Sequence, residues 1–213
     1  MHVVTGPTGP GFSGGFPSRA PSLSRKPKFV PHTRKARSPL QRANWPIEAA
    51  SLLFFDIETT SLHPDRGAQI TEMAVVDRHG VRLDWRRAPE QPHDDALATQ
   101  LPHLFDLLQT GVVVGHNLSF DVRFIAYVAS RLGLRGPTIR YIDTLGLARR
   151  LLDRTRDVRL TTLLDYFGIV PDGALHTARV DALATQALFW KLVAHGGLET
   201  LADAGLQRID WVA

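Results

Sequence analysis

Short apolar runs alternate with segments of helical period along most of the chain, and this alternation limits the fold more than any other feature. The runs are too short to be buried helices, and Leu52–Phe55 is continuous, as in a strand that is covered on both faces. A turn-like segment that ends in Gly80 separates two further runs and indicates a hairpin. Strands are therefore expected over residues 52–55, 70–76, 81–85, 112–114 and 139–142.

The intervening segments have the apolar spacing of helices. Leu97, Leu101, Leu104 and Leu108 follow one another at intervals of four, three and four, which places them on one helical face. Helices are expected over residues 94–108, 120–133, 145–152, 160–167 and 177–193. The order of elements predicts an α/β fold, with a mixed five-stranded sheet and helices on both faces.

The first 48 residues have a different composition and are expected to form a disordered basic tail, followed by a folded domain at 49–213. Residues 1–50 hold eight Lys or Arg and one Glu, a formal charge of +7, whereas the rest holds 17 bases and 20 acids, or −3. They also hold 8 of the 14 prolines. Such an arm could attract phosphate backbones, or it could be a solvated leader without a task, and both readings stay open.

Composition excludes several classes of protein. The chain has no cysteine, so any metal must be held by carboxylates, histidines or carbonyl groups. No apolar stretch approaches the ~20 residues that span a bilayer, so no membrane association is expected. Arginine outnumbers lysine 21 to 4, which indicates a GC-rich genome and, with it, a bacterial cytoplasm.

Four acidic residues lie where elements of an α/β fold end or begin. Asp56 and Glu58 end the first strand, and because side chains alternate along a strand, both project to the same side. Asp121 follows the fourth strand at the turn into a helix, and Asp181 lies near the start of the last long helix. Active groups of open α/β sheets collect at such strand ends. Divalent cations with oxygen ligands would neutralise this charge.

His176 precedes Asp181 by five residues, and this spacing corresponds to a rotation of ~140° in an ideal helix. The two side chains cannot face one site if both are helical. We therefore expect His176 in the loop before the helix. His116, directly after the fourth strand, is a rival for a general base, although its position favours a structural hydrogen-bonding role.

These residues resemble the motifs of the DnaQ-like 3′–5′ exonucleases of the DEDDh type, the family that includes the proofreading subunit of bacterial replicative DNA polymerase. The first motif is similar to residues 55–60, the second to residues 115–121 and the third to His176 through Asp181. The segments Ile70-Thr71-Glu72 and Asp143-Thr144 also fit. All of them occur in the family's order, and the resemblance covers roughly residues 50–195.

The resemblance implies a ribonuclease H-like fold and a two-metal hydrolysis of the terminal phosphodiester that releases 5′-mononucleotides. It implies that Asp56, Glu58, Asp121 and Asp181 hold two Mg²⁺ or Mn²⁺ ions and that His176 takes the proton from the attacking water. By similarity, Thr59 and Thr60 line the pocket for the terminal sugar and Leu62 packs against its base. Asn117 and Phe120, in the second motif, are further expected substrate contacts. Ser61 replaces the family's usual glycine, so the shape of this loop is expected to differ.

The expected function is a 3′–5′ exonuclease that acts on single-stranded 3′ ends of DNA in proofreading or repair. Two alternatives remain. One is an exoribonuclease that trims RNA ends, and the other is a non-catalytic, polymerase-associated subunit that binds nucleic acid. The intact carboxylate set argues against the second alternative. A polymerase subunit is the expected kind of partner, and the sequence does not indicate an oligomeric state.

Overall fold

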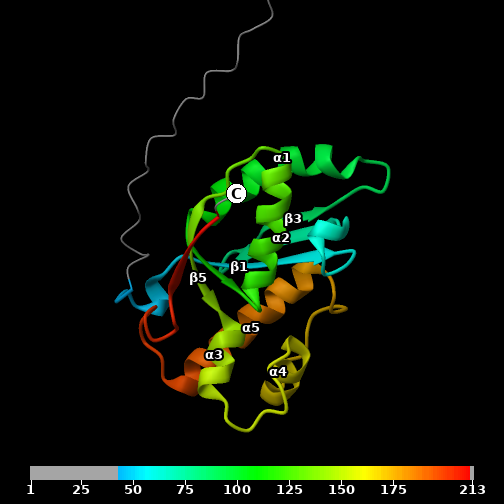
Figure 1. Ribbon diagram of the computed structural model, residues 1–213. Helices are drawn as coiled ribbons and strands as arrows, with labels where there is room; N and C mark the ends of the chain where they lie inside the picture. The colour runs from blue at the N-terminus through cyan, green and yellow to red at the C-terminus, as the bar shows by residue number, and fades with distance from the viewer. Residues whose placement is uncertain (1–42, 212–213) are drawn as a thin grey trace, which may run out of the picture. The chain divides into compact units, whose positions relative to one another are not determined.

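A six-stranded mixed sheet forms the centre of the computed structural model, which describes residues 43–211 (Figure 1). The strands lie in the order β3-β2-β1-β4-β5-β6. β1, β4 and β5 are parallel, whereas β2, β3 and β6 pair in antiparallel fashion. Their bounds are β1 (Leu52–Thr59), β2 (Ile70–Asp77), β3 (Gly80–Arg86), β4 (Val112–Gly115), β5 (Thr138–Asp143) and β6 (Gln207–Asp210).

Five α-helices cover the two faces of this sheet (Figure 1). They are α1 (His93–Leu108), α2 (Leu118–Arg131), α3 (Thr144–Leu151), α4 (Leu160–Phe167) and α5 (Ala178–Gly196). Alternate residues of β1 point to opposite faces, so Phe54 belongs to the apolar cluster that includes α3, α4 and α5, and Phe55 belongs to the cluster that includes α1 and α2. Each face has its own apolar cluster, as expected when helices lie on both sides of a sheet. None of the helices in residues 43–211 is long and apolar enough to cross a membrane.

The α/β class, the mixed sheet and the helices on both faces are confirmed, but the prediction of five strands is wrong. β6 is a sixth strand and pairs with β5. The five expected strands do not include Gln207–Asp210, which offers one apolar residue among three polar ones. Its position at the sheet edge explains this composition, since an edge strand keeps polar side chains in water. Trp211 follows β6 and is buried against the α1 and α2 face.

The described part of the expected tail packs on the domain. The Ile47 amide donates to the Glu199 carbonyl at 2.9 Å, and the Leu201 amide donates to the Trp45 carbonyl at 3.0 Å. Ile47 is 1% exposed and belongs to the cluster under α5. The packed segment therefore begins before residue 49. The rest of the expected tail, residues 1–42, lies outside the described residues.

β1 extends beyond its parallel neighbour, and this difference in length creates space for a site. The pairing of β1 with β4 ends at Phe54 and Val114, whereas the pairing of β1 with β2 continues to Thr59. The last residues of β1 therefore have a strand on one side only. The turn into α2 follows β4 directly and fills the other side.

The start of this parallel pair tests the register of the sheet. A Cβ atom on Gly111 would lie 2.5 Å from the Ser51 carbonyl oxygen, which also accepts a hydrogen bond from the Val112 amide at 2.8 Å. We expect Gly111→Ala to lower the free energy of unfolding by about 1–3 kcal/mol, because backbone must shift to accommodate the methyl group. Urea denaturation measures this change.

Gly146→Ala is the matched control, because a Cβ atom there meets nothing within 4 Å and the residue lies inside α3. Removing a helical glycine is expected to stabilise the domain by about 0.5–1 kcal/mol. Equal stability of Gly111→Ala and the unchanged chain would contradict the β1–β4 register.

Candidate active site

The site begins with the two carboxylates that end β1. Asp56 pairs with Ala74 and Glu58 pairs with Glu72 in the ladder between β1 and β2. Alternation along the strand places both acidic side chains on the face that α5 covers, where Phe54 also packs. Asp56 and Glu58 are partly buried. The predicted orientation of this pair to one side of the strand is therefore observed.

Asp121 reaches β1 through the gap that the shorter β4 leaves. It lies in the first turn of α2, and its side chain is 4% exposed. Its Oδ1 atom accepts a hydrogen bond from the Ile57 amide at 3.1 Å. Ile57 lies between Asp56 and Glu58, and the Asp121 carboxylate accepts the hydrogen bond that a neighbouring strand would otherwise accept from its amide. Asn117 precedes the helix with φ 61°, which turns the chain sharply out of β4.

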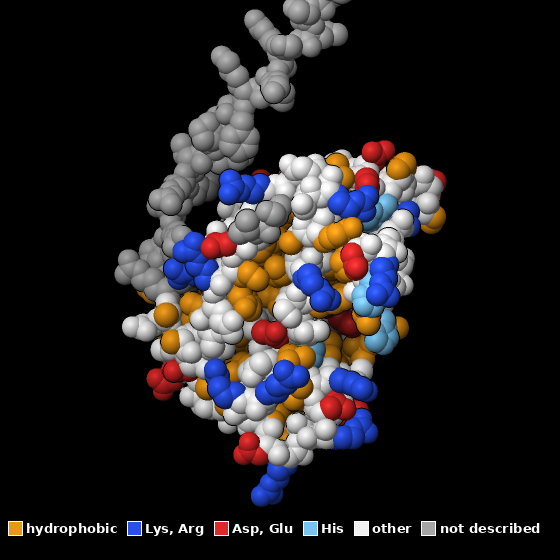
Figure 2. Space-filling model, viewed as in Figure 1, with side chains coloured by type: hydrophobic (Ala, Val, Ile, Leu, Met, Phe, Trp, Pro, Cys, Tyr) orange, Lys and Arg blue, Asp and Glu red, His pale blue; other side chains and the backbone are white. Residues whose placement is uncertain are grey.

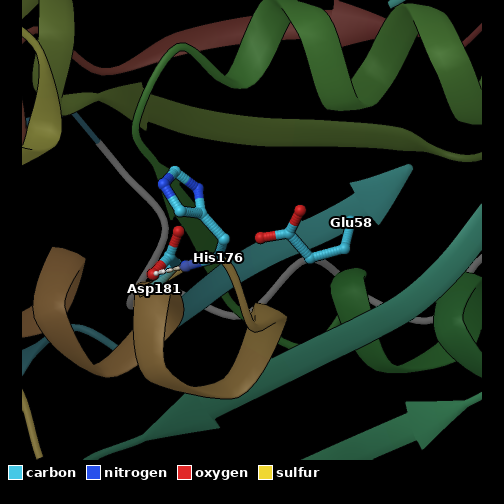
Figure 3. Close-up of side chains that lie close together, drawn as sticks. All are labelled: Glu58, His176 and Asp181. Atoms are coloured by element: carbon cyan, nitrogen blue, oxygen red, sulfur yellow. Dashed lines mark hydrogen bonds between the residues drawn. The ribbon is translucent and has the colours of Figure 1, made fainter. Parts of the chain in front are cut away.

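Asp181 and His176 approach the same strand end from α5. The helix begins at Ala178 and Asp181 lies in its first turn, so His176 stands in the preceding loop, as expected. Its φ of 69° is a left-handed conformation, and its amide donates to Asp181 Oδ1 at 3.2 Å. Figure 3 shows the Glu58 carboxylate pointing towards both residues. One ligand atom each of Glu58, His176 and Asp181 lies within 4.8 Å of the other two.

The acidic side chains raise one another's affinity for protons. Burial, followed by the charges of Asp121 and Asp181, raises the pKa of Asp56 well above its ordinary value. Burial likewise raises the pKa of Asp121 well above its ordinary value, against the effect of the hydrogen bond from Ile57. The pKa values of Glu58 and Asp181 are also raised, in both cases mainly by burial. Buried carboxylates that also repel one another are therefore the main electrostatic feature of this site.

This donor set fits divalent cations. Mg²⁺ and Mn²⁺ prefer oxygen ligands, and the group offers four carboxylates that approach one another from β1, α2 and α5. A bound cation would favour the charged form of each carboxylate and so offset the cost of burial. Glu58 and Asp181 share one group of ligand atoms with His176, and Asp56 lies close enough for the charges of Asp121, Asp181 and Glu58 to raise its pKa.

His116 makes a different contact. Its Nδ1 atom lies 2.9 Å from Thr144 Oγ1, and the Thr144 hydroxyl donates to the Gly115 carbonyl at 3.1 Å. Because that hydroxyl proton is already used, Nδ1–H is the donor to Thr144. Burial lowers the pKa of His116, which favours the neutral ring. This geometry supports a structural role that joins the end of β4 to the start of α3.

The residues expected to contact substrate lie around the carboxylates with different exposure. Thr59 Oγ1 donates to the Ser61 carbonyl at 2.9 Å, and Thr60 Oγ1 accepts from the Gln69 amide at 3.0 Å, so both hydroxyls shape the loop after β1. Leu62 is 65% exposed, which leaves its side chain free for contact with a ligand.

The other two lie at the start of α2. The main-chain amide of Asn117 donates to Asp143 Oδ1 at 2.9 Å. The Phe120 ring lies 5.8 Å from the Phe124 ring and 5.9 Å from the Arg123 guanidinium.

Glu72 also belongs to this neighbourhood, although its position in the sequence indicates no role for it. It lies opposite Glu58 on β2, and its Oε2 atom accepts from the Ala178 amide at 3.2 Å. The cross-strand register that brings Glu72 beside Glu58 is the signal that could have identified it. Glu58 and Glu72 form the last pair of the regular ladder, before the register shifts between Glu58 and Thr59, and residue patterns do not reveal where such a shift falls.

Basic side chains do not gather into one patch on the face in Figure 2, where Lys and Arg are dispersed among acidic and polar groups. This face therefore does not offer a polyanion a uniform basic surface.

The raised pKa values give a pH-dependent stability whose sign follows from the carboxylates. Each group binds its proton more tightly in the folded state, so stability falls as pH rises from the ordinary carboxyl range through the raised pKa. In metal-free protein at pH 8 the charged form of Asp56 destabilises the fold. We expect Asp56→Asn to raise the metal-free Tm by roughly 3 °C or more, and to reduce the further rise that Mn²⁺ produces.

Thermal unfolding at pH 5.5 and pH 8, with and without Mn²⁺, checks both effects. The Mn²⁺ shift is expected to be larger at pH 8, where protons compete less. Asp84→Asn is the control, because Asp84 lies on β3 beside Arg179 and outside the carboxylate group, so its Mn²⁺ shift should equal that of the unchanged chain. A lower metal-free Tm for Asp56→Asn would contradict this electrostatic description.

Comparison with known proteins agrees with this arrangement. Residues 88–189 match the family model of the RNase T group, described as exonuclease. A DNA polymerase III of the PolC type from Oceanobacillus iheyensis is 31% identical over 163 residues, which cover 67% of this chain and 11% of that protein. The chain therefore corresponds to about a tenth of the length of this relative.

Solved structures share the fold at low sequence identity. Cell-death related nuclease 4 (CRN-4) superposes with a TM-score of 0.55 and 15% identity, over 69% of this chain and 64% of that one. S. pombe Pop2p, in a form with bound Mg²⁺ and Mn²⁺, gives a TM-score of 0.53 and 13% identity over 75% and 87%. These likenesses bear out the ribonuclease H-like architecture. The family match and the PolC-type relative show that the chain carries a domain of the exonuclease family.

Proposed function

We propose that this chain is a metal-dependent 3′–5′ exonuclease of the DEDDh type that removes 5′-mononucleotides from the 3′ ends of DNA. The observation that carries the proposal is the approach of Asp56, Glu58, Asp121 and Asp181 to one strand end, with His176 beside them. Asp56 and His176 lie 120 residues apart in the sequence. Acidic residues that were merely solvated would have no reason to meet at one place in the fold.

The four carboxylates are the proposed ligands of two Mg²⁺ or Mn²⁺ ions. When bound, such ions stabilise the negative charge that develops on the attacking and leaving oxygens of an in-line displacement. The carboxylates would hold these cations beside the terminal phosphodiester. Water adds to phosphorus, the bond from phosphorus to the 3′ oxygen of the preceding nucleotide breaks, and the shortened strand keeps that oxygen as its hydroxyl.

His176 is the proposed general base. His176 is exposed, and its main-chain amide is held by a hydrogen bond to Asp181 Oδ1, so the ring stays accessible to a water molecule. Histidine is the side chain best suited to accept a proton near neutral pH. Glu58 lies within the same group of ligand atoms.

DNA is the proposed substrate, because the PolC-type relative is a DNA polymerase. Thr59, Thr60 and Leu62 are proposed to receive the terminal nucleotide, and Asn117 and Phe120 to contact the strand from the start of α2. A polymerase is the proposed kind of partner, in proofreading or repair.

Labelled oligonucleotides test polarity, substrate and metal requirement together. Single-stranded DNA, a mismatched primer-template and RNA of equal length, each labelled at the 5′ end, would be incubated with Mg²⁺ or with EDTA. We expect a ladder of shortening DNA with Mg²⁺, release of 5′-mononucleotides and no product with EDTA. Preferential shortening of the RNA oligonucleotide would show that RNA, and not DNA, is the substrate. Release of nucleotides that persists in EDTA would reject the proposed chemistry.

The two histidines provide a further test. His176→Ala is expected to lower kcat by about 10²–10⁴-fold, the usual contribution of a general base, with little change in Tm because the residue is exposed. His116→Ala is expected to lower the Tm through loss of the contact with Thr144, and to keep most of the kcat at a temperature where it is folded. Near-normal turnover of His176→Ala with Mg²⁺ would show that another group is the base.

A further inference from the structure

The start of α5 is fixed by a side chain from the sheet. Thr177, the residue before the helix, makes no side-chain cap, and its hydroxyl instead donates to the Ala174 carbonyl at 3.0 Å. The first amide of the helix, that of Ala178, donates to Glu72 Oε2 at 3.2 Å. A carboxylate at a helix N-terminus satisfies an open amide and interacts favourably with the helix dipole.

Glu72 is itself held from the other side. Its Oε1 atom pairs with the Arg86 guanidinium at 2.7 Å, and Arg86 lies directly opposite Glu72 in the β2–β3 ladder. The Glu72 side chain is 16% exposed, whereas that of Arg86 is 68% exposed. The pair therefore adds little net stability, but it directs one carboxylate oxygen towards α5.

The residues that follow this contact are those of the site. Asp181 lies in the same first turn as Ala178, and His176 lies two residues before Ala178. Because Asp181 also accepts the His176 amide, a shift of the helix start would move both groups together. Small errors in the position of reacting groups have large effects on rate.

We propose that Glu72, oriented by Arg86, is the positioning residue that fixes the start of α5 and so sets Asp181 and His176 against the end of β1. It acts through the Ala178 amide rather than on substrate. The activity consequence rests on the proposed exonuclease function, whereas the effect on the helix start does not.

Three variants of the full chain separate this role from others. Glu72→Ala removes the acceptor, Glu72→Gln keeps a side-chain oxygen for Ala178 but loses the charge pair, and Arg86→Ala removes only the orienting cation. Arg82→Ala is the matched control, because Arg82 also lies on β3 and pairs with a β2 carboxylate, Asp77, at 2.9 Å.

Hydrogen–deuterium exchange of the metal-free proteins is the readout that needs no activity. We expect faster exchange in Glu72→Ala over residues 178–184, and unchanged exchange over the later turns of α5. Glu72→Gln should restore most of this protection, Arg86→Ala should lose part of it, and Arg82→Ala should match the unchanged chain.

Kinetics with a short DNA substrate is the second readout. Glu72→Ala should lower kcat by roughly ten- to a hundredfold with little change in KM, because Thr59, Thr60 and Leu62 are untouched. Glu72→Gln should retain most of the kcat. If Glu72→Gln is as inactive as Glu72→Ala although its exchange is normal, Glu72 acts on the reaction directly and the proposal is overturned.

Unchanged exchange at residues 178–184 in Glu72→Ala would also overturn it, as would faster exchange throughout the domain, which would indicate a general loss of stability. If Glu72→Ala does not fold, Glu72→Gln and Arg86→Ala decide by the same two readouts. If the unchanged chain has no nuclease activity but the variants show the expected exchange pattern, the proposed function is rejected and this inference stands.

Discussion

Burial of carboxylates that also repel one another is the constraint on which the site depends. Asp56 and Asp121 both have strongly raised pKa values, and burial is the largest cause for each. A domain gains nothing in stability from placing acids in this way. The arrangement is understandable if divalent cations complete it, because they supply the charge that the described residues do not. On the proposed function, the scaffold gives up stability at one strand end to keep a metal site prepared.

Two features of the scaffold produce this convergence. β1 extends beyond β4, so the Ile57 amide has no partner on β4 and donates to Asp121 at the start of α2. The opposite approach comes from α5, which begins over the same strand end and brings Asp181 into its first turn. Both helix starts carry a residue with left-handed backbone just before them, Asn117 and His176. Tight turns of this kind let a helix begin within reach of the strand.

Much of this could be predicted from the sequence, because apolar periodicity and motif order are local properties. The runs at Leu52–Phe55 and Val112–Val114 identified the buried strands, and the five-residue interval placed His176 outside the helix. β6 was missed because a polar edge strand owes its structure to its partner. Glu72 gained no role because its contact with Ala178 spans 106 residues and depends on cross-strand register. Residue patterns do not carry such long-range geometry.

The central claim is that the four carboxylates form one cation site. Anomalous diffraction from crystals soaked with Mn²⁺ tests it most directly. The account predicts two peaks between Asp56, Glu58, Asp121 and Asp181, with carboxylate oxygens as the protein ligands. Peaks only elsewhere on the chain, or no peak beside Asp56 at a Mn²⁺ concentration that supports DNA cleavage, would contradict it.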